Sequence, residues 1–394
     1  MCDRPQNWTG ALTTIDRIQA TIADIPTIRG HVLSMTTMMC QSIVLVKVFF
    51  SDGSVGLGEG TTIGGMSYCP ESPESIKLAI DAYLAPALVG QDADRIAAAS
   101  LLMAKTVQGN TIARCAIETA LWDGLARRLN VSVAQLFGGA VHSSLPVAWT
   151  LASGNSQTDA EEALEMLEIR RHNVFKLKIG KRAVRDDVAH VAGIKKAVGD
   201  RASIRVDVNQ AWGITDARWG LAGLQEIGVD LVEQPIPRGY TAALKELTSS
   251  YEIAVMADES LQGPEDAAQV AAQRSADVFA IKIGQSGGLA PARDVISIAH
   301  AAGIDTYGGT MLEAGVGTAA SLQLFATISR MRWGTELFGP LLLRDEILTT
   351  PLQYGDFSVK VPTGPGLGVA LDEDKVAFYS RDRTRSVTFA AAGT

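Results

Sequence analysis

Carboxylates recur at the ends of short apolar segments in the second half of the sequence. Asp207 ends "RVD", Glu233 ends "LVE" and Asp258 follows "VMA". If these segments are successive parallel strands, their carboxyl ends meet at one edge of a sheet and gather the three side chains. Like charges repel strongly in a partly dry site, and a hard divalent cation removes that cost. Oxygen ligands suit Mg²⁺ or Mn²⁺, whereas zinc prefers His and Cys, so these residues predict a magnesium or manganese site.

Lysines stand beside these carboxylates in the same pattern. "VFKLKIG" is typical of a buried strand, and its Lys176 and Lys178 point the same way because the side-chain period of a strand is two. Lys282 ends "VFAIK" and is expected to face Lys178 across the site, with the metal between them. A lysine near another cation loses its proton more readily, so we expect a lowered pKa, to which Lys176 contributes. A neutral lysine can take a proton from a carbon next to a carboxylate, and an ammonium can return one while the metal stabilises the enolate.

Each of these residues, taken alone, has a simpler explanation. A strand-end Asp is often the N-cap of a helix, and Asp258, Glu259 and Ser260 together fit such a cap. A single strand-end lysine is often a surface charge, and Lys176 and Lys178 can be paired to carboxylates for structure only. The series favours chemistry, because carboxylates on three consecutive segments lie between a pair of lysines and a further lysine.

Eight strand-like segments position these side chains. They are "LPVAWTLAS", "NVFKLKIG", "SIRVDVN", "VDLVEQP", "IAVMADES", "VFAIKIG", "DTYGGTML" and "RWGTELFG", and they follow one another roughly every 25 residues. Helical stretches separate them, and near-continuous apolar strands of this kind indicate a parallel sheet that is buried on both faces. Eight such units favour a closed (β/α) barrel, whose active site lies at the C-terminal mouth. An open doubly wound sheet is the alternative, but the sequence lacks its glycine fingerprint after the first strand.

Other patterns flank the barrel segments. Residues 14–60 predict an antiparallel sheet with a hairpin turn at "SDGS", and residues 72–137 predict helices, the first with a Ser-Pro-Glu start and a Gly stop. The apolar stretch 314–328 is too short for a membrane span and predicts a buried helix. After residue 350, "FSVKVPTGPGLGVALDED" is typical of irregular or β structure that returns to the first unit.

Composition excludes several classes of protein. The chain of 394 residues has a net charge of −8 and no run rich in Lys and Arg, so we expect neither a nucleic-acid nor a membrane partner. Cys2, Cys40, Cys69 and Cys115 form no C-x-x-C pair, which argues against a disulfide framework or a zinc site. The first ten residues have neither the basic start nor the apolar run of a signal peptide. We therefore expect a cytoplasmic protein.

The motifs together resemble the enolase superfamily, in its muconate-lactonizing subgroup. "KLKIG", "RVDVNQ", "EQP", "ADES", "KIG", "YGGTMLE" and "WGTELFGPLLL" appear in the subgroup's order, from about residue 15 to about residue 380 for the whole resemblance. A lysine base with Mg²⁺ holding an ene-diolate is known chemistry of enolase-superfamily sites. The resemblance implies a (β/α)7β barrel of the TIM type with an α+β capping domain. We expect the capping domain at 1–140, the barrel at 141–350, and a C-terminal segment at 351–394 that returns to the capping domain.

The resemblance also implies a role for each residue of the site. Asp207, Glu233 and Asp258 bind the metal. Lys178 is the acid and base, and Lys282 lies on the opposite face of the substrate. Glu336 shares a hydrogen bond with the substrate carboxylate, and Lys176 and Asn209 support these groups. For Glu313, a direct role and a hydrogen bond to a neighbouring loop are both open. Gln285 departs from the pattern, because many relatives have a lysine there.

A flap over the barrel mouth is implied at "TTIGGMSY", residues 61–68. Its two glycines allow hinge motion, and Ile63, Met66 and Tyr68 offer contacts to the substrate. Phe338 is expected to close the other side of the site.

The implied reaction is intramolecular. One carboxylate of cis,cis-muconate adds to the diene and the resulting enolate is protonated to give muconolactone, in the catechol branch of aromatic degradation. Within the same fold, a racemase, a dipeptide epimerase and an o-succinylbenzoate synthase stay open. A non-catalytic barrel that binds a dicarboxylate is a further alternative. The resemblance also implies a homo-oligomer, since relatives form octamers.

Overall fold

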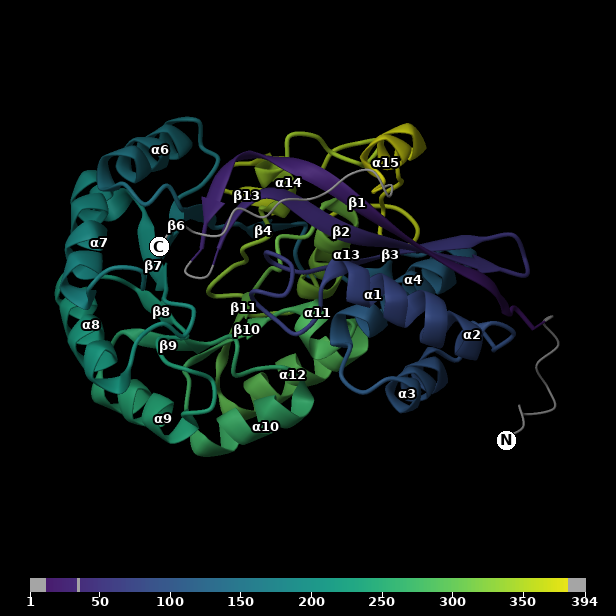
Figure 1. The fold of residues 1–394 in the computed structure, drawn as a ribbon, viewed down its shortest axis with the longest axis horizontal. Coiled ribbons are helices and arrows are strands. Elements are labelled where there is room, and N and C mark those ends of the chain that lie inside the picture. Colours follow the sequence, from purple (N-terminus) through teal and green to yellow (C-terminus); the bar gives the residue numbers. More distant parts are fainter. Residues whose placement is uncertain (1–11, 34–35, 382–394) are drawn as a thin grey trace.

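The central feature of the computed structural model, which describes residues 12–33 and 36–381, is a ring of parallel strands (Figure 1). Its sheet has seven strands in the order β11-β10-β9-β8-β7-β6-β5. They are β5 (Trp149–Leu151), β6 (Val174–Lys178), β7 (Ser203–Asp207), β8 (Leu231–Glu233), β9 (Ala254–Ala257), β10 (Val278–Ile281) and β11 (Asp305–Gly308). Thr335 bridges both Val147 and Gly308 in parallel, which closes the ring. The predicted (β/α)7β barrel is confirmed, and its eighth segment, "RWGTELFG", is reduced to this bridge.

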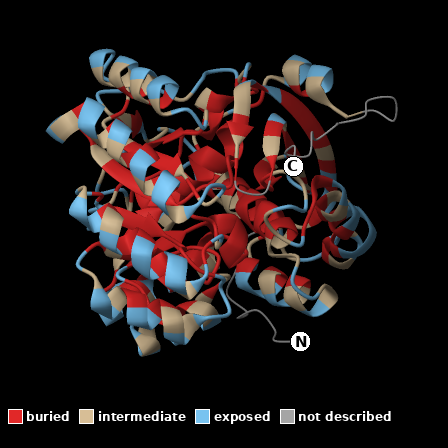
Figure 2. Ribbon diagram, turned by 60° about the vertical axis from the view of Figure 1, so that its left-hand side comes forward, coloured by how far each residue is buried: buried red, intermediate tan, exposed pale blue. Residues whose placement is uncertain are grey.

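Helices cover the outer side of the ring (Figure 1). They are α6 (Ser156–Glu168), α7 (Val184–Val198), α8 (Ile214–Glu226), α9 (Thr241–Ser250), α10 (Pro264–Gln273), α12 (Leu289–Ala302) and α13 (Gly315–Phe325). Two short helices lie nearer the first unit, α11 (Ile283–Ser286) against α4 and α14 (Gly339–Leu342) against β1. Most of the outer helices present one exposed face and one buried face (Figure 2), as amphipathic spacing dictates. Helix α13 is buried along its whole length, which confirms the prediction for the apolar stretch 314–328.

The first predicted barrel segment, "LPVAWTLAS", divides into two strands. Trp149–Leu151 (β5) pairs with β6 in the barrel. Ser144–Pro146 (β4) instead pairs antiparallel with β13 (Ser358–Lys360), which also pairs with β12 (Tyr354–Gly355). Pro146 has no N–H to donate to a central ladder, so a short strand at the margin suits it. The barrel strand is therefore shorter than the sequence predicts.

An antiparallel sheet, here called the capping sheet, lies beside the barrel mouth (Figure 1). It contains β1 (Ile15–Val32), β2 (Thr37–Phe50) and β3 (Val55–Thr61), with the predicted hairpin turn at residues 51–54. The predicted helical region contains α1 (Pro73–Ala79), a π-helical turn η1 (Ile80–Leu84), α2 (Ala85–Leu88), α3 (Ile96–Thr106), α4 (Thr111–Arg128) and α5 (Val133–Leu136). Ser72 forms the expected N-cap of α1 through a capping box. Helix α4 packs directly on β3, because a Cβ at Gly56 or Gly58 would lie 1.9 Å from a backbone oxygen of α4.

Two buried glutamates join this first unit to the barrel. Glu59 of β3 accepts hydrogen bonds from the backbone N–H groups of Ala314 (2.7 Å) and Gly317 (2.8 Å), at the start of α13. Glu118 of α4 accepts hydrogen bonds from Leu289 N (2.8 Å) and Ala290 N (3.0 Å), at the start of α12. Each carboxylate thus caps a barrel helix whose first N–H groups have no partner within the helix. Burial nevertheless raises the pKa of both glutamates to about 7.

The raised pKa of Glu118 predicts a pH-dependent stability. Between about 4.5 and about 7 the folded chain holds a proton that the unfolded chain has lost, so the free energy of unfolding falls as pH rises through this window and is flat above it. The Glu118→Gln variant should remove roughly 1 kcal/mol per pH unit from that decline. Urea unfolding at pH 5, 6, 7 and 8 measures it. The exposed Glu165→Gln substitution is the control, and an unchanged slope in Glu118→Gln would contradict the prediction.

The C-terminal segment lies against the first unit. Helix α15 (Glu373–Tyr379) contacts β1, and Arg381 forms ion pairs with Asp24 (2.6 Å) and with Glu74. Upstream, Leu367 N donates to Asp123 Oδ1 of α4 at 2.7 Å. The segment therefore packs as the sequence suggests, while the three domain boundaries stay a prediction.

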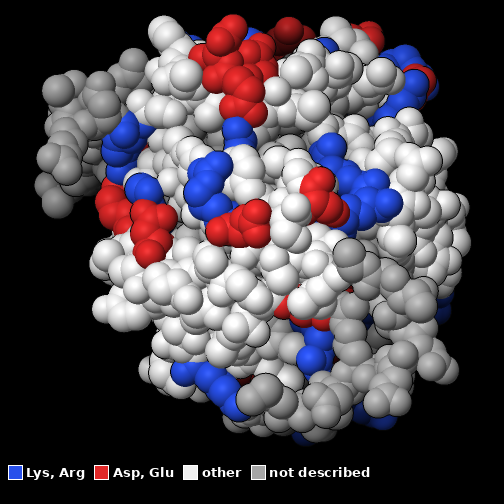
Figure 3. Space-filling model, turned by 90° about the vertical axis from the view of Figure 1, so that its right-hand side faces the viewer, with Lys and Arg blue, Asp and Glu red and all other residues white. Residues whose placement is uncertain are grey.

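Surface and span features are consistent with the composition. On the face drawn in Figure 3, acidic and basic side chains alternate without a large field of one sign. Within residues 12–33 and 36–381, no helix is both long and apolar enough to cross a membrane. Cys40, Cys69 and Cys115 are free thiols, and Cys2 lies outside the described residues.

Candidate functional site

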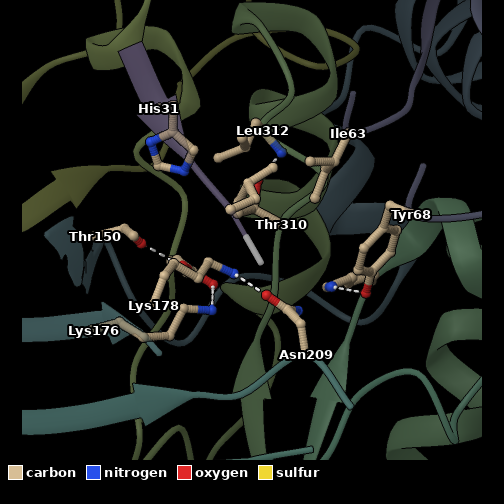
Figure 4. Close-up of a pocket in the computed structure, with 12 residues that line it drawn as sticks. His31, Ile63, Tyr68, Thr150, Lys176, Lys178, Asn209, Thr310 and Leu312 are labelled. Atoms are coloured by element: carbon tan, nitrogen blue, oxygen red, sulfur yellow. Dashed lines mark hydrogen bonds and ion pairs between the residues drawn. The ribbon is translucent and has the colours of Figure 1, made fainter. Parts of the chain in front are cut away.

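A narrow pocket lies at the carboxyl ends of the barrel strands, where the capping sheet meets them (Figure 4). The barrel contributes Thr150, Lys176, Lys178, Asn209, Lys282, Thr310, Leu312 and Glu336, and the first unit contributes His31, Leu33, Ile63 and Tyr68. Lysines from β6 and from the end of β10 thus face one cavity, as their positions in the sequence predict. The mouth of a barrel is where such folds place their chemistry.

Lys176 is held by carboxylates on three sides. Its Nζ donates to Glu336 Oε2 at 2.5 Å and to Glu233 Oε2 at 2.9 Å, and lies 3.4 Å from Asp207 Oδ2. Thr150 Oγ1 donates to the other oxygen of Glu336 at 2.8 Å. Burial alone would lower the pKa of Lys176, but these negative charges outweigh it and raise the pKa well above its usual value. Lys176 is therefore a fixed cation beside three carboxylates.

Lys178 lies on the same face of β6 and reaches a different set of oxygens. Its Nζ donates to Asp207 Oδ2 at 2.6 Å and to Asn209 Oδ1 at 3.2 Å. Asn209 adopts a left-handed backbone conformation, with φ of 46°, which Asn tolerates better than most residues. Its own Nδ2 donates to Glu259 Oε1 at 3.1 Å. The turn after β7 thus directs both the amide and Asp207 toward the Lys178 ammonium.

Lys282 and Asp258 face each other from adjacent strands. Lys282 Nζ donates to Asp258 Oδ2 at 2.7 Å and to the Tyr68 hydroxyl at 2.7 Å, and Tyr68 donates to the same Asp258 oxygen at 2.8 Å. Burial would lower the pKa of Lys282, yet Asp258 and nearby glutamates raise it. The lowering of the lysine pKa expected from a neighbouring cation is therefore wrong for Lys282. Tyr68 brings the segment 61–68 into direct contact with the barrel residues.

Asp258 is positioned by the strand before it and does not cap a helix. Gln234 Oε1 accepts hydrogen bonds from Asp258 N and Ser260 N, both at 3.1 Å. Helix α10 begins later, with Gly263 as its N-cap residue. The simpler N-cap explanation for Asp258 is therefore excluded. "EQP" and "ADES" are linked motifs, since the residue after Glu233 holds the backbone at Asp258.

The donor set of this cluster fits a hard cation. Asp258 Oδ1 and Glu259 Oε2 are buried with no hydrogen-bond partner, and unpaired buried carboxylate oxygens are costly. Burial and the charge of Asp258 raise the pKa of Glu259 to about 8, as expected where carboxylates outnumber cations. Among the described residues, no three acidic, His or Cys side chains are already gathered as a ligand group. Lys176 and Lys282 lie against the carboxylates instead.

Comparison with known proteins agrees with this arrangement. The family model for the N-terminal domain of mandelate racemase / muconate lactonizing enzyme matches residues 17–138. The model described as enolase C-terminal domain-like matches residues 158–375. The chain belongs to the mandelate racemase / muconate lactonizing enzyme family of the enolase superfamily. The resemblance stated from the motifs is confirmed.

Family members with known names are similar over nearly the whole chain. Muconate cycloisomerase 1-1 of Acinetobacter lwoffii is 55% identical over 375 residues, which cover 95% of this chain and 98% of that protein. A chloromuconate cycloisomerase of Cupriavidus necator is 48% identical, with coverage of 93% and 99%. The crystal structure of muconate lactonizing enzyme from Pseudomonas fluorescens complexed with muconolactone superposes with a TM-score of 0.93 at 50% identity, covering 94% of this chain and 100% of that one.

Three residues expected at the site of this family member lie away from the pocket. Glu313 Oε2 accepts hydrogen bonds from Thr310 Oγ1 (2.5 Å) and Met311 N (2.9 Å), so it braces its own loop. Phe338 is buried and packs edge-on against the Trp149 ring. Met66 is 65% exposed. Their contacts with substrate stay a prediction. Of the predicted flap, Ile63 and Tyr68 line the pocket.

Several pocket residues were not predicted from the sequence. His31 and Leu33 come from the end of β1, and Thr310 and Leu312 come from the loop after β11. His31 is buried with an unpartnered Nδ1, and burial together with the Lys178 charge lowers its pKa well below its usual value. A neutral imidazole therefore faces the substrate space. The sequence signals for the loop were its position after a barrel strand and the motif "YGGTMLE", which contains Thr310 and Leu312.

Proposed function

We propose that this chain catalyses the cycloisomerisation of cis,cis-muconate to muconolactone. The observation that carries the proposal is a pocket with Lys178 and Lys282 beside a buried carboxylate cluster, in a chain 55% identical to a muconate cycloisomerase. A site with two amines and paired carboxylates suits a reaction through an enolate. A binding-only barrel has no need of amines poised at the same cavity.

The proposed reaction is written from the residues of the pocket. The oxygen of one substrate carboxylate bonds to the diene carbon four atoms away, and the electron pair moves to the carbon next to the other carboxylate. The Lys178 ammonium then donates a proton to that carbon. Lys282 keeps its positive charge, because its pKa is raised by Asp258, and offsets the developing negative charge. Glu336, held by Lys176 and Thr150, orients the substrate carboxylate.

We further propose that Asp207, Glu233 and Asp258 hold Mg²⁺ or Mn²⁺. When bound, the ion supplies positive charge to the substrate carboxylate as the enolate develops. The unpartnered Asp258 Oδ1 supports this proposal. Lys176 and Lys282 supply positive charge beside these carboxylates. Burial and the neighbouring carboxylates still raise the pKa of Glu233 well above its usual value, so a bound cation would favour the ionised form of the ligand set.

A spectrophotometric assay with cis,cis-muconate tests the proposed function. Absorbance of the conjugated diene should decrease with added Mn²⁺ or Mg²⁺ and stop decreasing with EDTA, and the product should be muconolactone. A chlorinated muconate assayed in parallel shows whether this chain resembles its chloromuconate-converting relatives in substrate range. Absence of turnover with either metal would reject the proposal in favour of an epimerase, a racemase or an o-succinylbenzoate synthase, which share the amine pair.

The setting of the enzyme is also a proposal. We infer a cytoplasmic location from four cysteines without a pairing motif and from the three free thiols in the structure. We infer a homo-oligomer from the resemblance alone. Gel filtration with light scattering measures the assembly directly.

A further inference from the structure

The loop between β11 and α13 holds one pocket residue in a strained conformation. Leu312 has φ of 63°, in the left-handed region that branched side chains rarely adopt. It is 4% exposed, and it lines the pocket beside His31 and Ile63 (Figure 4). Outliers of this kind persist only where surrounding contacts determine them, and they gather at ligand sites. The contacts that hold Leu312 therefore affect the shape of the pocket.

The hydrogen bonds of this loop come from two sources. Its own side chains satisfy the N–H groups, since Met311 N donates to Glu313 Oε2 and Leu312 N donates to Thr310 Oγ1, both at 2.9 Å. The carbonyl groups are satisfied from another part of the chain. Gln41 Nε2 donates to Met311 O at 3.1 Å and to Leu312 O at 3.0 Å. The side-chain amide of Gln41 thus donates to the carbonyl before Leu312 and to the carbonyl of Leu312 itself, the residue with the left-handed backbone conformation.

Gln41 reaches the loop from the capping sheet. It lies on β2 and is 1% exposed, so water does not compete for its amide. The separation along the chain is 270 residues from Met311. Gln41 is not among the residues that line the pocket, and its side-chain amide donates to this loop.

We propose that Gln41 is a positioning residue that sets the shape of the substrate pocket by holding Leu312 in its left-handed conformation. The two hydrogen bonds keep the carbonyls of Met311 and Leu312 turned toward the capping sheet, and the Leu312 side chain consequently forms part of the apolar wall of the cavity. A planar diene needs such a wall, so this inference rests on the proposed function for its substrate. Release of the loop lowers affinity for cis,cis-muconate and admits bulkier chlorinated muconates.

Gln41→Met is the test variant, because Met has a similar length and no donor. KM for cis,cis-muconate should rise about tenfold, as expected for two lost hydrogen bonds, while kcat changes less than about threefold. In a Leu312→Gly background the same substitution should leave KM unchanged, because Gly adopts positive φ without strain and has no side chain to place. The KM ratio of chlorinated to unsubstituted muconate should fall in Gln41→Met.

Gln323→Met is the matched control. Gln323 is also buried, and its Nε2 also donates to two carbonyls, Pro362 O at 2.8 Å and Leu367 O at 3.2 Å, but it lies outside the pocket. The Gln323→Met substitution should reduce the stability of the protein without changing KM for cis,cis-muconate. An equal rise in KM for Gln323→Met, or the same rise in the Leu312→Gly background, overturns the proposal.

A crystal structure of Gln41→Met supplies a result that does not depend on turnover. Leu312 should leave the left-handed region in that variant and keep it in Gln323→Met. A φ still near 63° in Gln41→Met overturns the inference even if the enzyme converts muconate. Conversely, a wild-type chain without muconate turnover rejects the proposed function and leaves this structural result to decide the role of Gln41.

Discussion

Replacing Lys178 by alanine is expected to lower kcat for cis,cis-muconate by about 10³-fold, the scale of a lost general acid. Lys178 is a cation that both lines the pocket and is held by only one carboxylate, at 2.6 Å from Asp207. Lys176, by contrast, is fixed by three carboxylates and has no proton to give readily. The measurement is steady-state turnover with saturating metal. Lys181→Ala, an exposed residue three positions further on, should leave turnover unchanged.

Solvent deuterium distinguishes this assignment from the alternatives. In D₂O, the wild-type enzyme should place one deuterium on a single face of the product carbon. Lys282→Ala should be slower because a stabilising charge is lost, yet its residual product should carry deuterium on the same face. A racemase or epimerase needs both amines to exchange protons. Deuterium on the opposite face of the product carbon in Lys282→Ala would therefore reject Lys178 as the acid. So would deuterium incorporation by Lys178→Ala that is lost when Lys282 is also replaced.

Replacing Lys176 by methionine is expected to lower the free energy of unfolding by about 3–5 kcal/mol, the usual cost of removing one partner from a buried ion pair. The Lys176 side chain is 2% exposed, and Glu233, Glu336 and Asp207 would lose the charge that balances them. Because a divalent cation can replace that charge, saturating Mn²⁺ should restore part of the stability of Lys176→Met and have a smaller effect on the wild type.

Urea unfolding with EDTA or with Mn²⁺ measures this effect. Lys47→Met is the control, because the Glu373 partner of Lys47 is 64% exposed and exposed ion pairs contribute little. A loss below about 1 kcal/mol for Lys176→Met, or a metal response no larger than that of the wild type, would show that the cluster is not governed by charge balance.

The predictable part of the site is the part carried by barrel strands. Lys176, Lys178 and Asp207 were expected to converge because strand periodicity and the rule for barrel mouths are local and general, and in the structure Asp207 lies within 3.4 Å of both ammonium groups. The lowered pKa expected for a lysine of this site was wrong for Lys282. The sequence argument weighed one lysine against another, whereas in the fold the carboxylates outnumber the lysines.

The part contributed by other elements could not be predicted. His31 reaches the pocket because β1, a long strand, extends over the barrel mouth. The packing of one sheet against another cannot be predicted from a local sequence pattern. Leu312 adopts positive φ in a segment with neither Gly nor Asn at that position, so propensity argues against the observed turn. The role expected for Phe338, closing the other side of the site, stays a prediction. Its ring packs edge-on against Trp149, with 5.0 Å between the ring centroids, a tertiary contact that a local sequence pattern does not reveal.

The ion pair between Arg381 and Asp24 has a consequence for how the chain is made. These residues are separated by 357 positions, so a ribosome adds Arg381 only after the first strand has been outside the exit tunnel for roughly tens of seconds. During that time β1, which carries His31, lacks α15 and the segment at Arg344 that donates to Pro26 O. Contacts this distant in sequence form slowly. The contacts of β1 with the C-terminal segment therefore form last, and the N-terminal strand is the feature that chaperones would have to shield during synthesis.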